Sequence, residues 1–152
     1  LGWYCVGVSL WAFDELPASV WGRGVWLRDS ADVAFAGQLH FSGSGTAGFD
    51  CGFETAMRKW VEIAGEAGSL VCDDFTRPWS PEKARFWLHD ANGKAAEHRS
   101  EPFVQEDCLV AAFCRLVRTG PDHAWAETAL KVQRVCDALL RSARTGAMVS
   151  LE

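Results

Sequence analysis

The chain shows a helical pattern of apolar residues near each end and an alternating pattern between them. Along residues 1–13, apolar side chains surround nearly the whole circumference of a helix: Leu1, Trp3, Tyr4, Val6, Val8, Leu10, Trp11 and Phe13. A helix that is apolar on all sides is usually buried on several of them, so we expect this helix to lie inside the protein. It should end before Pro17, because the residue that precedes a proline disfavours helical geometry.

From residue 18 to residue 100, apolar and polar residues alternate, as in half-buried β-strands. In the segment 32–43, most odd-numbered positions are apolar, whereas Gln38 and His40 fall on the other face. Short turn sequences join the segments, and the strongest is Asn92-Gly93. The pattern predicts about six or seven strands in an antiparallel sheet. They are expected within 19–29, 32–43, 45–55, 57–65, 69–75, 84–90 and 95–102.

One face of this sheet is apolar and the other is polar, which indicates a sheet covered on one side only. After Pro102 the helical period returns in two segments, 105–120 and 124–146. Their apolar stripes predict helices that pack on the apolar face of the sheet, leaving the other face open. The expected fold is therefore a single α+β domain over residues 1–152. The stripes consist of Leu109, Phe113 and Leu116, and of Trp125, Ala129, Val132, Cys136, Leu139 and Ala143.

Charge and composition exclude some classes of function. The formal net charge is −5 and the basic residues are scattered, so no surface for nucleic acid is expected. No apolar run approaches the ~20 residues that a membrane-spanning helix needs, so no membrane partner is expected either. Eight tryptophans and nine phenylalanines accompany a single tyrosine, Tyr4. This aromatic content predicts a large aromatic core, an adhesive surface, or both.

The six cysteines, at 5, 51, 72, 108, 114 and 136, include no CxxC pair. Most lie in apolar periodic stretches, so we expect reduced core thiols in a cytoplasmic protein. The four histidines have no metal-ligand spacing, and the adjacent Asp73 and Asp74 should point to opposite sides of a strand. The glycines of GSGTAG precede a strand and not a helix, so they predict no phosphate site. From these patterns we expect neither metal-binding nor cofactor-binding residues.

Three segments resemble the C-terminal domain of the Gfo/Idh/MocA oxidoreductases, the family of glucose-fructose oxidoreductase and inositol dehydrogenase. LGWYCVGVSLWAF is similar to the opening helix, where the family has the pattern D-x-G-x-Y or D-x-G-x-H. The segment 45–79 resembles the central strands, including their G-T/E-x-G-S/T-L turn, and 105–146 resembles the closing pair of helices. The likeness extends over nearly the whole chain.

The resemblance implies an NAD- or NADP-dependent enzyme that transfers hydride between a nicotinamide and a sugar, polyol or diol. Gly2 and Tyr4 match the family motif, and Tyr4 falls on the position that transfers the hydroxyl proton. The tyrosine version resembles the branch of glucose-fructose oxidoreductase and the dihydrodiol dehydrogenases. Because a phenol has an ordinary pKa of about 10, this role requires a nearby cation, which a lysine of the N-terminal half supplies in the family.

Parts of the family pattern have no counterpart in this sequence. The motif aspartate would precede Leu1, and both the Rossmann GxGxxG and the Glu-Lys-Pro stretch are missing; PEKA at 81–84 is no substitute. We therefore expect a fragment that lacks its N-terminal Rossmann domain and is inactive alone. Its last residues, Leu151 and Glu152, are either native or the remnant of a cloning site.

Two non-catalytic alternatives stay open. Family members dimerise by stacking the open faces of these sheets, and the glycine-rich polar face around Gln38, Gly48 and Gly52 suits the close approach of a second copy. The chain would then be a dimerisation module and a homo-oligomer. The second alternative is a carbohydrate-binding module that uses exposed tryptophans, for which the candidates are Trp21, Trp26, Trp79 and Trp87.

Overall fold

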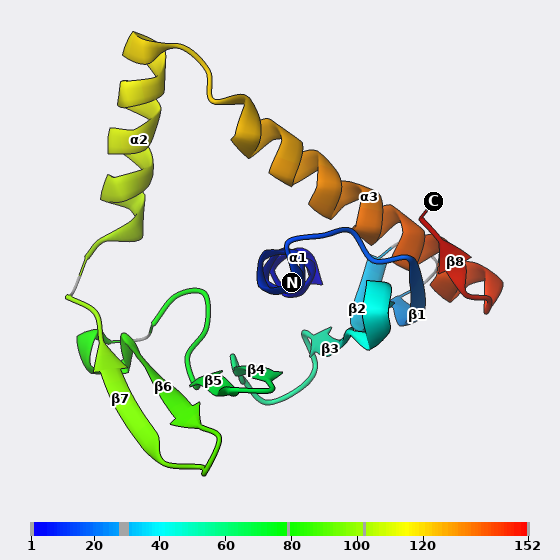
Figure 1. Ribbon diagram of the computed structural model, residues 1–152. Coiled ribbons are helices and arrows are strands. Elements are labelled where there is room, and N and C mark those ends of the chain that lie inside the picture. The colour runs from blue at the N-terminus through cyan, green and yellow to red at the C-terminus, as the bar shows by residue number, and fades with distance from the viewer. Residues whose placement is uncertain (1, 28–30, 79, 102, 152) are drawn as a thin grey trace. The chain divides into compact units, whose positions relative to one another are not determined.

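A computed structural model describes residues 2–27, 31–78, 80–101 and 103–151 (Figure 1). The chain forms two compact units, the first built from Leu1–Thr55 and Asp122–Glu152 and the second from Ala56–Pro121. Three residues named above, Leu1, Trp79 and Glu152, lie outside the described residues, as does Pro102. The first unit therefore unites the two ends of the chain, and the second occupies the middle of the sequence.

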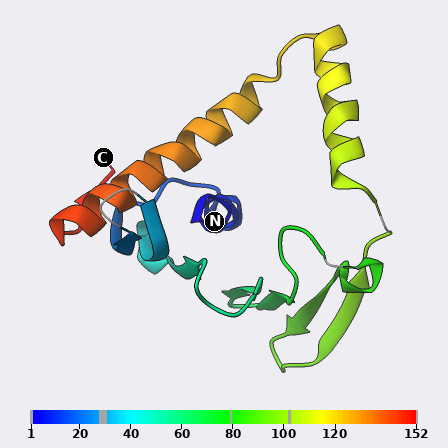
Figure 2. The same cartoon turned by 180° about the vertical axis from the view of Figure 1, so that it is seen from behind.

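The first unit contains a four-stranded antiparallel sheet in the order β3-β2-β1-β8. Its long strands follow one another through short connections, and the short strand β8 pairs with the start of β1. Two helices accompany the sheet, and α3 packs against β1 (Figures 1 and 2). The elements are α1 (Gly2–Phe13), β1 (Ser19–Leu27), β2 (Ala31–His40), the 3₁₀ turn η1 (Ser42–Ser44), β3 (Thr46–Gly52), α3 (His123–Thr145) and β8 (Val149–Ser150).

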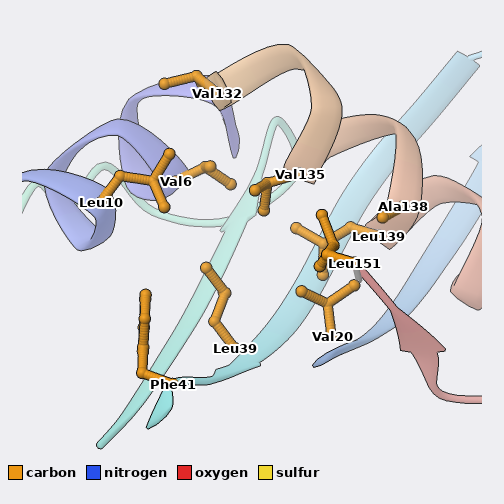
Figure 3. Close-up of a cluster of buried hydrophobic side chains, with 10 residues drawn as sticks. All are labelled: Val6, Leu10, Val20, Leu39, Phe41, Val132, Val135, Ala138, Leu139 and Leu151. Carbon is orange, nitrogen blue, oxygen red and sulfur yellow. The ribbon is translucent and has the colours of Figure 1, made fainter. Parts of the chain in front are cut away.

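The core of the first unit lies between the sheet and the two helices (Figure 3). Strand β2 contributes Leu39, which is fully buried, and the odd-numbered side of β2 faces the core as its alternation predicts. Apolar area removed from water in this layer is the main stabilising contribution to the unit. The buried cluster consists of Val6, Leu10, Val20, Leu39, Phe41, Val132, Val135, Ala138, Leu139 and Leu151.

A pair of glycines lets α3 approach the sheet closely. Gly22 of β1 and Gly37 of β2 are directly opposite each other in the antiparallel register. A β-carbon at Gly22 would lie 2.5 Å from the carbonyl oxygen of Leu139 on α3. A β-carbon at Gly37 would lie 2.6 Å from the ring of Phe49 and 3.1 Å from Leu139 Cδ2. Both positions therefore have space for hydrogen only, which explains glycine in the middle of two strands.

The buried hydroxyl of Ser142 connects α3 to β1 at the same place. The amide of Gly22 donates a hydrogen bond of 3.0 Å to Ser142 Oγ, which in turn donates one of 2.6 Å to the carbonyl of Ala147. Ser142 is fully buried, so both bonds are shielded from water. Helix α3 begins at an Asp122 cap that accepts from the amide of Ala124 and ends at Gly146, which has a φ of 70°.

The second unit contains a separate antiparallel sheet in the order β4-β5-β6-β7. Gly68 at the start of β5 has a φ of 151°, and a β-carbon there would lie 2.0 Å from the carbonyl oxygen of His89, so glycine is required. No described residue of α2 is buried. The elements are β4 (Val61–Gly65), β5 (Gly68–Cys72), the 3₁₀ turn η2 (Pro81–Lys83), β6 (Arg85–Asp90), β7 (Ala95–Arg99) and α2 (Gln105–Thr119).

The structure confirms the α+β class, the antiparallel pairing and each of the seven expected strands. It differs in arrangement, since eight strands form two sheets of four and not one sheet of six or seven. The eighth strand, β8, has only two residues, too few for an alternating pattern to reveal. The helical stripes are confirmed in part, because Val132 and Leu139 are buried whereas Leu109, Phe113 and Trp125 are exposed.

Two expectations about burial were wrong. Helix α1 is buried on one face only, since Trp3, Tyr4 and Trp11 are 44%, 58% and 70% exposed. An apolar sequence shows that a surface prefers to be covered, but it does not show what covers it. The cysteines are free thiols as predicted, yet none is fully buried, and Cys108 and Cys114 on α2 are exposed.

The close approach at Gly22 predicts that Gly22→Ala destabilises the chain. The added methyl group overlaps the backbone oxygen of Leu139, which no side-chain rotation can relieve. We expect the free energy of unfolding to fall by about 1–3 kcal/mol, the usual cost of overpacking. Urea unfolding followed by tryptophan fluorescence measures this change.

The matched control is Gly48→Ala on β3, where a β-carbon would meet no atom within 4 Å. The control should change the free energy of unfolding by less than about 0.5 kcal/mol. Equal stability of the two variants would show that α3 does not rest on the Gly22–Gly37 pair as described.

Candidate active site

Helix α1 positions Tyr4 by burying the opposite side of the helix. Val6 and Leu10 are in the core, and a β-carbon at Gly7 would lie 4.0 Å from Val132 Cγ2 on α3. At the start of the helix, a β-carbon at Gly2 would lie 3.6 Å from the ring of Phe49 on β3. These contacts hold α1 between α3 and β3 and determine which of its faces points outward.

Tyr4, Val8 and Trp11 lie on the outward face, because their spacings of four and three place them along one side of a helix. The ring of Tyr4 meets that of Trp3 edge to face, with centroids 6.4 Å apart and planes at 86°. Tyr4 is 58% exposed, and its hydroxyl bonds to no other residue in the described part of the chain. A phenol in this position can donate a proton to a group from outside the chain, or accept one from it.

The described residues do not fit a dinucleotide. Pyrophosphate binding requires a parallel strand, a glycine-rich turn and the start of a helix in succession. Within the described ranges, both sheets are antiparallel throughout, and α2 follows Val104 without a side-chain cap. The turn at 42–45 leads into β3, as its sequence predicts. The described residues therefore contain no strand-turn-helix unit of the kind that binds a pyrophosphate.

Asp73 and Asp74 have different environments, as expected for neighbours that point apart. Asp73 accepts from Arg85 at 3.3 Å and from Lys83 at 3.4 Å, and the Arg85 guanidinium lies 4.6 Å from the ring centroid of Trp87. Desolvation acts to raise the pKa of Asp73, but the Arg85 hydrogen bond and the Lys83 charge outweigh it and lower that pKa. This arrangement is an ion-pair network at the end of a strand.

Asp74 is buried and forms an ion pair with Lys59, which also donates to the carbonyl of Arg77. The sequence did not predict this contact. An acidic residue after a strand normally faces solvent, and nothing in the spacing of Lys59 and Asp74 joins them. The backbones of the two residues also pair in an isolated bridge, so we assign the ion pair to holding together the loop before β4 and the loop after β5.

Of the tryptophans proposed for carbohydrate binding, the three that the structure describes are not the most exposed tryptophans of the described chain. Trp21, Trp26 and Trp87 are half-buried, and the indole of Trp26 covers the position where a β-carbon of Gly24 would lie. The tryptophans with the largest exposed fractions are Trp3, Trp11, Trp60 and Trp125. Trp26 and Trp87 thus have packing partners, since the Arg85 guanidinium lies over the ring of Trp87. This weakens the carbohydrate-binding alternative for these two residues.

Two further features of the described chain offer no binding site. Among the described residues, no three side chains of histidine, cysteine, aspartate or glutamate converge on a common metal position. A shallow hollow on α3 lies between Leu130 and Arg141, but Gln133 in it donates to Asp137 and Arg134 donates to the carbonyl of Leu151. Three of its four polar side chains therefore have hydrogen-bond partners within the chain. No helix of the described chain is long and apolar enough to cross a membrane.

Comparison with known proteins places this architecture among oxidoreductases. The chain is 26% identical over its full length to D-xylose 1-dehydrogenase (NADP(+)) 2 of Haloferax volcanii, of which it covers 47%. Among solved structures, it aligns over 99% of its length with aldose-aldose oxidoreductase from Caulobacter crescentus complexed with glycerol, at a TM-score of 0.82 and 20% identity. That alignment covers 46% of the Caulobacter protein.

A third relative is an oxidoreductase from Agrobacterium radiobacter solved with NAD⁺, L-tartaric acid and magnesium. It aligns with 99% of this chain and 47% of its own, at a TM-score of 0.71 and 15% identity. No protein-family model matches the sequence. The chain thus spans about half the length of the proteins it matches, and that half is their C-terminal part.

The fold defined here is that of the C-terminal, α+β half of sugar oxidoreductases. The resemblance stated from the sequence is thereby confirmed, and the chain is similar to the C-terminal domain of the Gfo/Idh/MocA oxidoreductases. The opening helix, the strands and the closing helices, on which that resemblance rested, are all present in the structure.

Proposed function

We propose that this chain is the substrate-side half of an NAD- or NADP-dependent oxidoreductase that acts on a sugar, polyol or diol. The observation that carries the proposal is the position of Tyr4, the tyrosine of the matched motif, on the exposed face of α1. The names of the relatives support the substrate class, since one acts on D-xylose and another on aldoses.

Tyr4 is proposed to transfer the proton of the substrate hydroxyl while the redox step takes place at the cofactor. A phenol performs this role near neutral pH only when a cation stabilises its phenolate. Among the described residues, no lysine or arginine contacts the Tyr4 hydroxyl. The cation is therefore expected to come from outside the chain. Removal of water from the closed site would strengthen this interaction.

The cofactor is proposed to bind to an N-terminal Rossmann domain that is not part of this sequence. The antiparallel sheets support this division, because they offer no parallel strand-turn-helix unit in the described ranges. We also propose a cytoplasmic location for the complete protein, which the six free cysteines favour. The 152-residue chain alone is expected to be inactive.

Calorimetry tests whether the chain binds the dinucleotide by itself. Titration of the chain with NADH and with NADPH should give no heat of binding up to about 1 mM dinucleotide. A Kd of about 1 mM corresponds to a binding free energy of only about −4 kcal/mol. Binding at micromolar concentration would contradict the proposal, because it would require a dinucleotide site within this chain.

In the complete enzyme, Tyr4→Phe should lower kcat by a factor of about 10²–10⁴, the usual contribution of a positioned general acid or base. KM should change far less, because the ring and its contact with Trp3 are kept. Steady-state assays over a panel of pentoses, hexoses and diols measure both quantities.

The control is Trp60→Phe, which alters another exposed aromatic residue, in the loop before β4. It should leave kcat within about twofold of the unaltered enzyme. A Tyr4→Phe enzyme with unchanged kcat would remove Tyr4 from the mechanism and leave only the fold assignment.

A second proposed role, homo-oligomerisation, is supported by the open face of the first sheet. Trp21, Gln38 and Gly48 form one cross-strand row on this face, and Arg23, Ala36 and Asp50 form the next. A β-carbon at Gly48 would meet no atom within 4 Å, so the sheet is uncovered there. Gly48 and Ala36 are the small residues of these two rows, and they leave room for a second sheet to approach closely.

Sedimentation of the chain at increasing concentration tests this role. We expect a monomer–dimer equilibrium that Gly48→Arg shifts at least tenfold toward the monomer, because the new side chain stands on the proposed interface. Thr128→Arg serves as the control, since Thr128 lies on α3 at the covered side of the sheet. A strict monomer at every concentration would exclude stacking of this face.

A further inference from the structure

Cys5 and Cys51 bring two thiols together from separate elements. Cys5 lies on α1, three residues after Gly2 and therefore on the same face of the helix, and Cys51 lies on β3. The two thiols are close enough for each to shift the pKa of the other. The first turn of α1 is close to β3 here, because a β-carbon at Gly2 would lie 3.8 Å from Cys51 Sγ. Both cysteines are half-buried, so the thiols are held in place by packing and remain within reach of small molecules.

The two thiols differ in their tendency to ionise. The hydrogen bond from Cys5 lowers the pKa of Cys51 to about 7, although burial acts in the opposite direction. The same hydrogen bond, followed by burial and the Cys51 charge, raises the pKa of Cys5. The nearby carboxylates of Asp32 and Asp50 oppose ionisation of Cys51. A thiolate beside a neutral thiol is the arrangement that reacts with peroxides and then with its neighbour.

The remaining cysteines are placed differently, although the charge of Cys51 also contributes to raising the pKa of Cys136. Cys136 on α3 is half-buried, and desolvation, aided by the charge of Asp137, raises its pKa to about 11. Cys72 in the second unit donates to the carbonyl of Arg85 at 3.5 Å. Cys108 and Cys114 are exposed on α2. Cys51 is therefore distinguished by both its contact and its environment.

We propose that Cys5 and Cys51 form a peroxide-sensitive dithiol that closes into a disulfide between α1 and β3. The Cys51 thiolate attacks one oxygen of hydrogen peroxide, the O–O bond breaks, and Cys51 becomes a sulfenic acid as hydroxide leaves. The Cys5 sulfur then attacks the Cys51 sulfur and displaces a second hydroxide. The thiol protons neutralise these ions, so two thiols and one peroxide give one disulfide and two waters.

The disulfide would act on the helix that carries Tyr4. Cys5 is the next residue after Tyr4, and α1 is otherwise held by apolar contacts with α3 and β3. A covalent bond at Cys5 fixes the first turn of α1 to the sheet, and an external dithiol releases it. Formation of the disulfide does not depend on the proposed oxidoreductase function, so the two can be tested separately.

The test uses the 152-residue chain treated with hydrogen peroxide and then with N-ethylmaleimide. Non-reducing peptide mass mapping should show a cross-linked peptide pair that contains Cys5 and Cys51, lighter by two hydrogens and separated again by dithiothreitol. The proposal is overturned if the maleimide still alkylates both cysteines after the peroxide treatment, or if Cys51 is joined to Cys136 instead.

Variants separate the two steps. Cys5→Ala should abolish the cross-link and leave a Cys51 sulfenic acid that dimedone traps, whereas Cys72→Ser, a half-buried cysteine of the second unit, should leave the Cys5–Cys51 cross-link unchanged. The alkylation rate of Cys51 should rise with pH through a midpoint near 7. In Cys5→Ala the midpoint should move up, toward the ordinary thiol value of about 8.5. An unchanged midpoint would contradict the assigned role of Cys5, and circular dichroism checks that each variant is folded.

Discussion

The first unit depends on the distance between α3 and the sheet. Glycine at two opposed positions, Gly22 and Gly37, lets the backbone of Leu139 rest on the strands, and Ser142 adds buried hydrogen bonds at the same place. A helix held one methyl group farther away would leave Val20, Leu39 and Leu139 with gaps that the surrounding side chains could not fill. The packing of α1, which rests on both α3 and β3, follows from this distance.

The orientation of Tyr4 is a consequence of that packing. Because Val6 and Leu10 are buried in the core, the opposite side of α1 faces outward, and Tyr4 and Trp11 lie on it. An aromatic, uncharged surface of this kind is unusual on a helix exposed to water. It is the type of surface on which a further protein segment packs, and the proposed proton-transfer group lies on it.

Much of the fold could be predicted from the sequence because strands and turns have local signals. Alternation identified β1 to β7, and Asn92-Gly93 marked the hairpin of β6 and β7, where Gly93 has a φ of 80°. The division into two sheets was not predictable in this way, since alternation reports the face of a strand and not its neighbours. The proposed role of Tyr4 rests on the resemblance to a family motif, because spacing alone gave no catalytic signal. The contacts of Cys5 with Cys51 and of Lys59 with Asp74 join distant positions that share no local pattern.

The first unit is discontinuous in the sequence, with the second unit between its two parts. During synthesis on the ribosome, α1 and the strands β1 to β3 emerge early, but Val132, Val135 and Leu139 emerge only after the whole second unit. Until then, the apolar side of this nascent sheet has no helix α3 to cover it, and such surfaces are prone to aggregate. We therefore expect molecular chaperones to be needed chiefly while the middle of the chain is being translated.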